Sequence, residues 1–381
     1  MITIQTIKEQ LTQNQPLVDD ILHLNLAHCG IQIHSNSQAL LDKLRVYFKS
    51  CNVVDDKEEI STAVNIPIIA IESQPPELGI DFIDWKREPG KKGRKDEYFD
   101  FTNSDGKQGR VVRKVRTGMV FLQSEQELIA AGPSIQYDNQ VINYINSQYM
   151  NWLQNNGWRI CHASGLVANH SETPKGIAIA GLSGGGKSTL MLEILNNEDI
   201  AYVTNDRLFI KQGQGEQGNQ VGMLGIPKLP RINPGTIVGN PLLHGLLDPQ
   251  QLSHYEAMER QELWDIEEKN DVPVADVYGE DSVQSGGNLS AFILLNWHRD
   301  GDEPVSLLEV DIQQRRDLLP AIMKSPGPFY QYTDGHFEQD TAEFDEEAYL
   351  QSLKGVKIYE AKGTIDFTKM SELCMEVITS Q

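Results

Sequence analysis

The sequence is short of cysteine and of long apolar runs, and each shortage excludes a class of protein. Its four cysteines, Cys29, Cys51, Cys161 and Cys374, are widely scattered and form no Cys-x-x-Cys pair. This scatter argues against a zinc site or a disulfide framework and favours a reduced, cytoplasmic setting. The first ten residues are polar, and no run approaches the ~20 apolar residues that a membrane span needs, so we expect neither export nor membrane insertion.

Positive charge is also scarce, because 33 Lys and Arg residues stand against 54 Asp and Glu residues. A nonspecific binder of nucleic acid neutralises phosphates with clustered Lys and Arg, so we expect no nucleic acid among the partners. The length of 381 residues suggests two domains. We expect an α+β domain of unclear role over residues 1–140 and a second domain over residues 141–381. In the second domain, strand and helix patterns alternate as in a parallel α/β core.

Glycine is concentrated in one segment, Gly181-Leu-Ser-Gly-Gly-Gly-Lys187-Ser188, which fits the pattern Gly-x-x-x-x-Gly-Lys-Ser/Thr. The apolar residues 177–180 before it predict a buried strand, and residues 189–195 after it predict a helix that faces a core. Glycines allow successive backbone N–H groups to point at phosphate oxygens, and the N-terminus of the helix adds partial positive charge. The segment therefore predicts binding of the triphosphate of a nucleotide, ATP with Mg²⁺.

The residues of this segment divide between nucleotide and metal. We expect Lys187 to reach the β and γ phosphates and the Ser188 hydroxyl to ligate Mg²⁺. The predicted nucleotide-binding residues are Gly181, Ser183, Gly184, Gly185, Gly186, Lys187, Ser188 and Thr189. Such a loop needs an acidic residue at the end of a nearby strand to hold the metal. The strand predicted over residues 200–204 ends in Asn205-Asp206-Arg207, so Asp206 is the candidate, directly or through water, unless it is a helix cap or a surface-turn carboxylate.

Residues 159–210 resemble the catalytic domain of HPr kinase/phosphorylase and its relatives. The resemblance is carried by His162 in Cys-His-Ala-Ser-Gly-Leu-Val, by the glycine-rich segment, and by Thr-Asn-Asp-Arg where that family has Ala-Asp-Asp-Arg. Lys228-Leu-Pro-Arg231-Ile-Asn-Pro-Gly235 and Leu294-Leu-Asn-Trp297 look more like the branch called HPr kinase-related kinase B. The resemblance spans residues 158–330. It implies an α/β fold with a P-loop kinase core of the HPr kinase type, beside a separate α+β N-terminal domain.

The family assigns one aspartate of its pair to base catalysis and the other to Mg²⁺. Carried over by position, the metal role falls on Asp206, and the base position is occupied by Asn205. A neutral amide cannot take a proton from a hydroxyl, and loss of a general base typically costs about 10² to 10⁴ in rate. Either alignment and electrostatics carry most of the acceleration, or another group is the base. The resemblance places His162 beside the transferred phosphate, so its imidazole is the leading substitute.

Further charged residues are candidates, each with a structural alternative. Arg207 is expected to grip an acidic acceptor or to stabilise charge on the γ phosphate, or else to pair with a neighbouring carboxylate. Arg231 lies in a proline-braced stretch from which an arginine could reach a phosphate, unless the prolines only brace a connection. Weaker candidates are Lys228 for phosphate contact and Asp276, Glu280 and Asp281 as bases on a predicted loop, and His298 and Arg299 receive no role.

Three functions fit these residues. The first is a kinase that moves the γ phosphate of ATP to a hydroxyl of a protein serine or a small metabolite. The second is an ATP-binding regulatory module in which Asn205 marks lost transfer chemistry, and the third is an NTPase that couples hydrolysis to a partner. Retention of His162, Lys187, Ser188 and Asp206 together favours the kinase. The acceptor is not selected by the sequence. HPr kinases assemble as hexamers, which leaves a homo-oligomer open.

Overall fold

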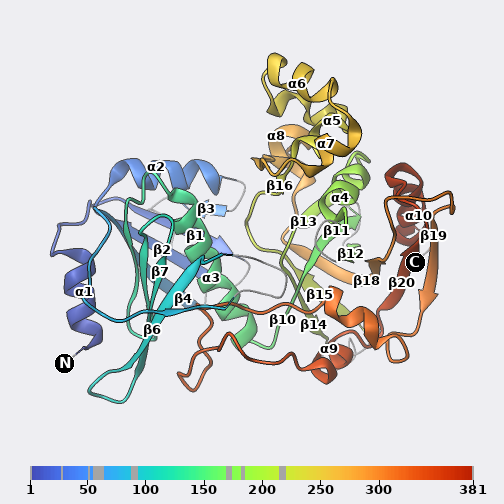
Figure 1. Cartoon of the computed structure of the whole chain (residues 1–381). Helices are drawn as coiled ribbons and strands as arrows, with labels where there is room; N and C mark the ends of the chain where they lie inside the picture. Colours follow the sequence, from blue (N-terminus) through green and yellow to red (C-terminus); the bar gives the residue numbers. More distant parts are fainter. Residues whose placement is uncertain are drawn as a thin grey trace. The chain divides into compact units, whose positions relative to one another are not determined.

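The computed structural model describes residues 2–26, 29–49, 52–54, 64–86, 93–168, 174–181, 185–213 and 220–379. The chain forms two compact units, Met1–Gly157 with Ser325–Glu343 and Trp158–Lys324 with Phe344–Gln381 (Figure 1). The predicted boundary lies at residues 140/141, whereas the structure places helix α3 (Asp138–Asn155) in the first unit. The reason is packing: the buried Tyr144 hydroxyl of this helix donates a hydrogen bond of 2.6 Å to the carbonyl of Leu122.

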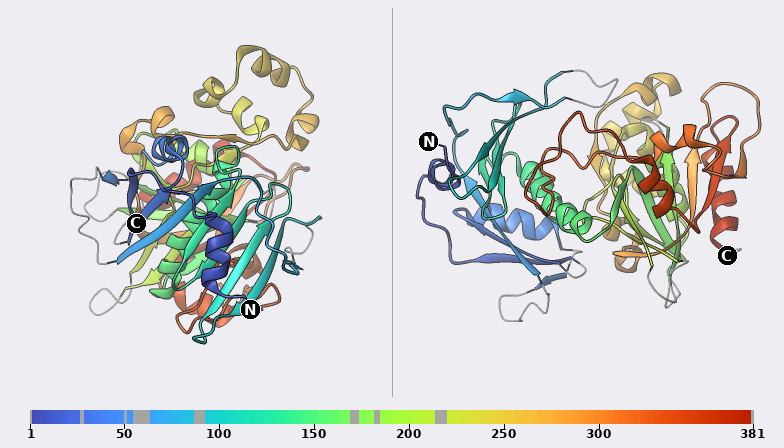
Figure 2. Two further views of the ribbon diagram at one scale, coloured as in Figure 1. Left: turned by 90° about the vertical axis from the view of Figure 1, so that its left-hand side faces the viewer. Right: turned by 90° about the horizontal axis from the view of Figure 1, so that it is seen from below.

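The first unit is built on a nine-stranded sheet with the order β3-β1-β2-β4-β9-β8-β7-β6-β5. Its strands are β1 (Ile21–Leu26), β2 (Cys29–Ser35), β3 (Asn52–Val54), β4 (Val64–Glu72), β5 (Ile83–Asp84), β6 (Asp96–Thr102), β7 (Gln108–Lys114), β8 (Val120–Ser124) and β9 (Leu128–Gly132). Helix α1 (Ile4–Thr12) packs its buried residues against one face of this sheet (Figure 2). Helix α3 packs on the other face, through Tyr144 and Phe121, beside α2 (Gln38–Tyr47).

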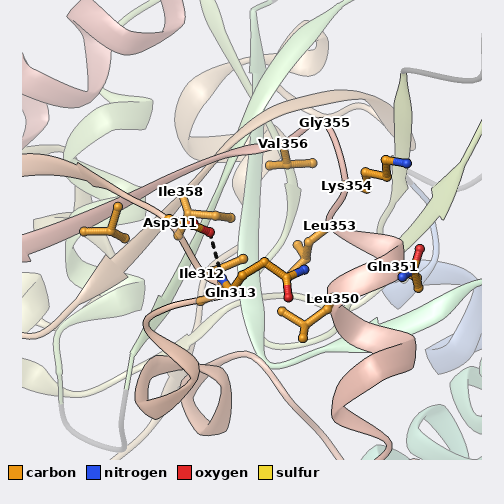
Figure 3. Close-up of a pocket in the computed structure, with 11 residues that line it drawn as sticks. Asp311, Ile312, Gln313, Leu350, Gln351, Leu353, Lys354, Gly355, Val356 and Ile358 are labelled. Carbon is orange, nitrogen blue, oxygen red and sulfur yellow. Dashed lines mark hydrogen bonds between the residues drawn. The ribbon is translucent and has the colours of Figure 1, made fainter.

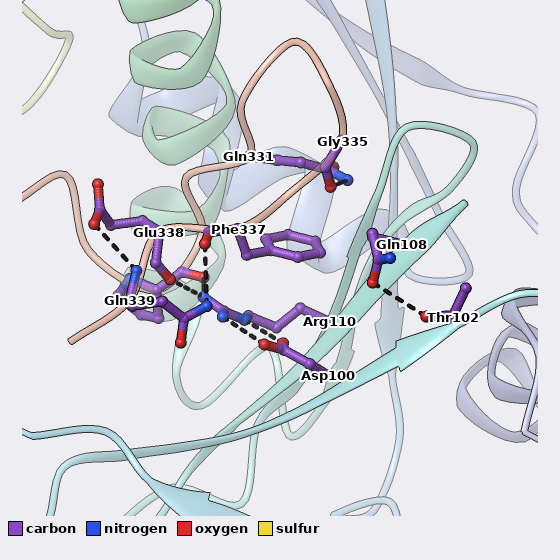
Figure 4. A network of polar contacts seen from close by, with 10 residues as sticks. Asp100, Thr102, Gln108, Arg110, Gln331, Gly335, Phe337, Glu338 and Gln339 are labelled. Carbon is purple, nitrogen blue, oxygen red and sulfur yellow. Dashed lines mark hydrogen bonds and ion pairs between the residues drawn. The ribbon is translucent and has the colours of Figure 1, made fainter. Parts of the chain in front are cut away.

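One cation of the first unit is fully buried. Arg110 is 0% exposed, and its guanidinium binds both carboxylate oxygens of Asp100 at 2.6 and 2.8 Å. It also donates to the carbonyls of Pro328 and Glu338, at 3.0 and 2.8 Å (Figure 4). Three rings lie beside it, those of Trp85, Tyr98 and Phe337. Because each buried guanidinium N–H needs an acceptor, this arrangement attaches the segment 325–343 to the strands of the first unit.

The second unit contains the other large sheet, with the order β10-β14-β15-β18-β12-β11-β13 and with β20 between β18 and β19. Its strands are β10 (Arg159–Cys161), β11 (Ala163–Ala168), β12 (Lys175–Gly181), β13 (Ile200–Thr204), β14 (Leu208–Gln212), β15 (Val221–Leu224), β18 (Gly286–Leu295), β19 (Ser306–Val310) and β20 (Lys357–Lys362). Among the described ladders of this second sheet, only the pairs β12–β18 and β18–β20 are parallel. The predicted parallel core is therefore a mixed sheet. Its β11–β12 pair is antiparallel because the connection over residues 169–174 is shorter than the dozen or so residues of a parallel crossover.

Both faces of this sheet are covered. Helices α4 (Lys187–Leu195) and α10 (Phe367–Thr379) pack on one face, and η4 (Arg316–Ala321) and α9 (Glu346–Ser352) pack on the other. A helical insert lies on the α4 side (Figure 1) and consists of α5 (Pro234–Val238), η2 (Pro241–Leu246), α6 (Pro249–Glu256), α7 (Arg260–Asp265), α8 (Val274–Tyr278), η3 (Glu280–Ser282) and the strand pair β16 (Arg231–Ile232) and β17 (Asn270–Asp271). In the described part of the chain, we find no helix with the length and apolarity needed to cross a membrane.

Candidate functional site

The glycine-rich segment joins β12 to α4. Gly181 is the last residue of β12 and pairs in parallel with Leu295 of β18, and α4 begins at Lys187. The strand and the helix that the sequence predicts on either side of the segment are both present. Of the predicted nucleotide-binding residues, Ser183 and Gly184 lie outside the described residues. The others lie at the strand end and in the first turn of the helix, where the main-chain N–H groups of a helix have no partners within it.

Gly186 is the N-cap of α4 and needs to be glycine for two reasons. Its φ of 84° belongs to the left-handed region, and a Cβ at this position would lie 2.7 Å from Cε1 of Phe367. The neighbouring carbonyl of Gly185 accepts a hydrogen bond of 2.8 Å from Nε1 of Trp297, whose indole meets the Phe367 ring edge to face. The Trp297 and Phe367 rings thus fix the backbone at Gly185 and Gly186, directly before α4 begins.

Lys187 and Thr189 point to different sides of the loop. The Lys187 ammonium donates a hydrogen bond of 2.9 Å to the carbonyl of Gly181, so the side chain reaches from the start of the helix back to the end of β12. The Thr189 hydroxyl lies 2.8 Å from the hydroxyl of Thr236 in the helical insert. Lys187 therefore places one positive charge at the end of β12, and α4 is tied to the insert through Thr189.

Ser188 contacts Asn205. Its hydroxyl donates a hydrogen bond of 2.9 Å to Oδ1 of Asn205, which begins the turn between β13 and β14. The buried Ser164 of β11 donates to the Asn205 carbonyl at 2.7 Å and also reaches Oδ1 at 3.2 Å. Three oxygen-bearing side chains from a strand, a helix start and a turn thus converge on one point.

Asp206, the next residue of the turn, lies beside an imidazole, an ammonium and a guanidinium. Its Oδ1 is 3.2 Å from Nε2 of His162, and its Oδ2 is 3.5 Å from Nζ of Lys324 and 4.0 Å from Nε of Arg207. The side chain is 51% exposed, whereas that of Lys324 is 12% exposed. Crowding by neighbouring atoms raises the pKa of Asp206, but the hydrogen bond from His162 and the charges of Lys324 and Arg207 outweigh it, so the pKa lies well below its ordinary range.

His162 is the single residue between β10 and β11, and its side chain lies in this cluster. The backbone N–H of His162 donates a hydrogen bond of 2.7 Å to the carbonyl of Ile322, two residues before Lys324. The same contact therefore aligns the segment that carries Lys324. Lys324 is absent from the sequence prediction, because no motif surrounds it and its proximity to Asp206 depends on the path of the chain after η4.

The remaining candidates lie in or beside the helical insert. Arg231 pairs with Asp271 across the β16–β17 ladder at 3.0 Å, and Arg299 lies 3.7 Å from Asp265. The predicted loop around Asp276, Glu280 and Asp281 is in fact two short helices, α8 and η3. The carbonyl of Lys228 accepts a hydrogen bond from the Tyr202 hydroxyl, and the His298 amide donates one to the Gly363 carbonyl.

The chemistry of the oxygens at Ser188 suits a hard cation more than a transition metal. Among the residues that the structure describes, no group of three or more His, Cys, Asp or Glu side chains is placed to hold a metal ion. The oxygens around Ser188 come instead from hydroxyl and amide groups, which are ligand types for Mg²⁺ and not for zinc.

A hollow of about 350 Å³ lies elsewhere in the second unit (Figure 3). It is formed by the end of β19, by α9 and by the start of β20, and it is lined by apolar residues such as Ile312, Leu350 and Ile358 together with Asp311 and Lys354. These apolar residues belong to the core on the α9 side of the sheet, whereas α4 packs on the opposite side. The hollow is therefore separate from the glycine-rich loop.

Comparison with known proteins gives a distant structural match and no sequence match. Among solved structures, the chain is similar to the Hpr(Ser) kinase/phosphatase from Coxiella burnetii at 15% sequence identity and a TM-score of 0.27, covering 58% of this chain and 94% of that chain. No family model matches the chain, and no curated protein matches its sequence.

Proposed function

We propose that this protein is an ATP-dependent kinase that transfers the γ phosphate to a hydroxyl acceptor, within the HPr kinase-like group and its kinase B branch. The observation that carries the proposal is the start of α4 directly after Gly186, with the Lys187 ammonium held at the Gly181 carbonyl at the end of β12. The N–H groups of a helix start and an adjacent ammonium group form a binding site for a polyanion. Gly186 packs closely against the Phe367 ring, and its lack of a side chain allows the backbone to approach the phosphates closely.

The chain's own residues suit both parts of an Mg-ATP complex. Gly181, Gly185 and Gly186 would present their backbone to the phosphates, Lys187 would exchange the Gly181 carbonyl for phosphate oxygens, and Ser188 would supply a hydroxyl to Mg²⁺. When bound, Mg²⁺ would supply positive charge that neutralises the phosphates. Two residues are candidates for the second protein ligand of the metal. Position in the sequence favours Asp206, directly or through water, and the contact with Ser188 favours Asn205.

His162 is the base that the geometry favours. In the transfer, an acceptor hydroxyl oxygen bonds to the γ phosphorus, the bond from that phosphorus to the β–γ bridging oxygen breaks to leave ADP, and the hydroxyl proton passes to the imidazole. Asp206 is itself a poor base, because its pKa is held well below the ordinary range. It instead orients the ring by accepting a hydrogen bond from Nε2. Arg207 and Lys324 add positive charge for the γ phosphate, and Arg231 has a more distant supporting role.

The neutral Asn205 supports a second candidate function, an ATP-binding regulatory module that has lost transfer chemistry. An NTPase that couples hydrolysis to a partner is the third. The three differ in the fate of the γ phosphate, which ends on an acceptor, stays on ATP or is released as inorganic phosphate.

The test is an assay of purified protein with ATP labelled in the γ position, Mg²⁺ and a cell lysate fraction. The wild type is compared with Lys187→Ala and with Lys369→Ala, a matched control on the exposed face of α10. We expect a labelled acceptor with the wild type and the control, and none with Lys187→Ala. Free labelled phosphate without a labelled acceptor would establish the NTPase instead. ATP binding without turnover would establish the regulatory module, and absence of ATP binding would refute all three.

A further inference from the structure

We propose that Ser188 Oγ and Asn205 Oδ1 form the protein side of the Mg²⁺ site, and that Asp206 belongs to a separate anion-binding cluster with His162, Lys324 and Arg207. The inference rests on the proposed function, because Mg²⁺ enters this site with the nucleotide. It moves the metal role from the second residue of the turn to the first. It also gives the amide at position 205 a use that does not require it to accept a proton.

The spacing of the two oxygens supports this assignment. Mg²⁺ binds oxygen ligands at about 2.0 to 2.1 Å in octahedral geometry, so neighbouring ligands at right angles lie about 3 Å apart. Ser188 Oγ and Asn205 Oδ1 are 2.9 Å apart. The two atoms are therefore already spaced as one edge of the coordination octahedron, before any metal is present.

The amide of Asn205 is held in this orientation by its surroundings. Ser164, which is 0% exposed, donates a hydrogen bond to the main-chain carbonyl of Asn205 and so fixes the start of the turn. The described contacts of the Asn205 side chain are with the hydroxyls of Ser164 and Ser188, and both are made by Oδ1. Oδ1 accepts both hydrogen bonds, so the oxygen end of the amide lies at Ser188.

The charges around Asp206 disfavour a divalent cation at that carboxylate. Lys324 lies 3.5 Å from Oδ2 and Arg207 lies 4.0 Å from it, so a metal bound there would meet two like charges at close range. The same two groups attract an anion. Asp206 thus holds His162, Lys324 and Arg207 together at a position suited to the transferred phosphate or to a negatively charged acceptor.

The affinity for Mg²⁺ of a site made of a hydroxyl and an amide should depend on whether the nucleotide is bound. Two neutral oxygens offset little of the cost of dehydrating Mg²⁺, which in nucleotide sites obtains its negative ligands from the phosphates. We therefore expect weak metal binding by the protein alone and strong binding with ATP. An aspartate in place of Asn205 would supply the missing charge and strengthen metal binding in both conditions.

The experiment measures binding and not activity. ATP affinity of the full-length chain is measured by calorimetry with Mg²⁺ and with EDTA, and bound Mn²⁺ is measured by electron paramagnetic resonance with and without ATP. We expect Asn205→Ala to reduce the gain in ATP affinity that Mg²⁺ provides by about 10-fold or more. Asp206→Asn should leave that gain nearly unchanged, and Asn205→Asp should increase Mn²⁺ binding without ATP.

The outcomes separate this inference from the proposed function. If Asp206→Asn removes the metal-dependent gain and Asn205→Ala retains it, Asp206 is the metal ligand and the inference is wrong, while nucleotide binding stands. Equal ATP affinity of the wild type with Mg²⁺ and with EDTA also overturns it. A wild type that binds no ATP in either condition overturns the proposed function as well. Should Asn205→Ala fail to fold in a melting experiment, the isosteric Asn205→Asp decides, since weaker Mn²⁺ binding by that variant contradicts the inference.

Discussion

Arg110 in the first unit and Asp206 in the second are both charges surrounded by partners, but the two surroundings differ in exposure and in balance. Arg110 is 0% exposed, and its partners include one carboxylate and two carbonyls that match its N–H groups (Figure 4). Asp206 is 51% exposed, and one carboxylate faces an imidazole, an ammonium and a guanidinium. The first arrangement gives four of the five guanidinium N–H groups an acceptor within the fold, whereas the second sets one carboxylate beside two cationic side chains and an imidazole.

The difference shows which charges serve stability and which serve binding. A buried charge needs all its hydrogen bonds satisfied within the fold, and the loss of one partner leaves an uncompensated group in a medium that solvates it poorly. A half-exposed carboxylate is solvated by water, so it can lose one partner to a ligand at little cost to the fold. Substitutions in the two clusters should therefore affect different measurements.

The largest effect should follow Arg110→Met. The substitution keeps an apolar stem but leaves Asp100 and the carbonyls of Pro328 and Glu338 without their donor. Loss of one member of a buried pair typically costs about 3 to 5 kcal/mol. We expect the free energy of unfolding of the first unit to fall by about that amount in urea titrations, and ATP affinity to stay unchanged. Arg116→Met, at an exposed position of the same unit, is the matched control and should stay within about 0.5 kcal/mol of the wild type.

Glu360→Gln should have a somewhat smaller effect on the free energy of unfolding. It tests whether a buried charge in the second unit contributes to stability as Arg110 does in the first. Glu360 is 1% exposed, and Arg315 binds it at 2.6 Å with further contacts from Asn296 and Lys362. The hydrogen bond from Arg315 is the main cause that lowers the pKa of Glu360 to about 2. We expect the substitution to reduce the free energy of unfolding by about 3 kcal/mol at neutral pH.

The pH dependence gives this prediction its sign. Because folding depresses the pKa of Glu360, the stabilisation is fully present above the ordinary glutamate pKa of 4.5 and is lost as the pH falls toward about 2. The difference in stability between wild type and Glu360→Gln should therefore shrink over that interval in acid titrations of unfolding. A difference that stays constant down to pH 2 would contradict the assigned role of the charge.

A third effect, on rate and not on stability, should follow Asp206→Asn. The amide retains the volume of the side chain but removes the charge that orients His162 and holds Lys324. We expect phosphoryl transfer to slow by about 10²-fold, while the free energy of unfolding changes by less than about 1 kcal/mol because the Asp206 carboxylate is half exposed. Rates from the labelled-ATP assay and urea titrations on the same samples check both parts. A loss of stability as large as that of Arg110→Met would erase the distinction between the two clusters.

The same contrast explains how much of the site the sequence predicts. The strand that ends at Gly181 and the helix that begins at Lys187 follow from local rules for apolar periodicity and helix ends, so both are predicted in order. The contact of Ser188 with Asn205 depends on β11 pairing antiparallel with β13, with Gly165 opposite Thr204. The mixed sheet and its registers are long-range features, which a prediction of parallel pairing misses.

Two other residues lie beyond local rules for similar reasons. Lys324 reaches Asp206 through the path of the chain after η4, and no spacing in the sequence marks it. From the sequence alone, Arg110 would be predicted to lie on the surface of a strand, because arginine is rarely buried. Its burial depends on the segment 325–343, which returns to the first unit from far along the chain.

The smallest effect should come from the loop, with Trp297→Phe. The Trp297 indole N–H holds the carbonyl of Gly185, and the planar trans peptide then directs the N–H of Gly186 the opposite way. Phenylalanine keeps a ring beside Phe367 and removes only this hydrogen bond, which is typically worth about 1 kcal/mol. We expect ATP affinity in calorimetry to fall by about fivefold with little change in the melting temperature, whereas Trp152→Phe in the first unit should alter neither. Unchanged ATP affinity in Trp297→Phe would contradict this role of the hydrogen bond. The glycines and the start of the helix would then be sufficient to present the N–H groups without a fixed Gly185 carbonyl.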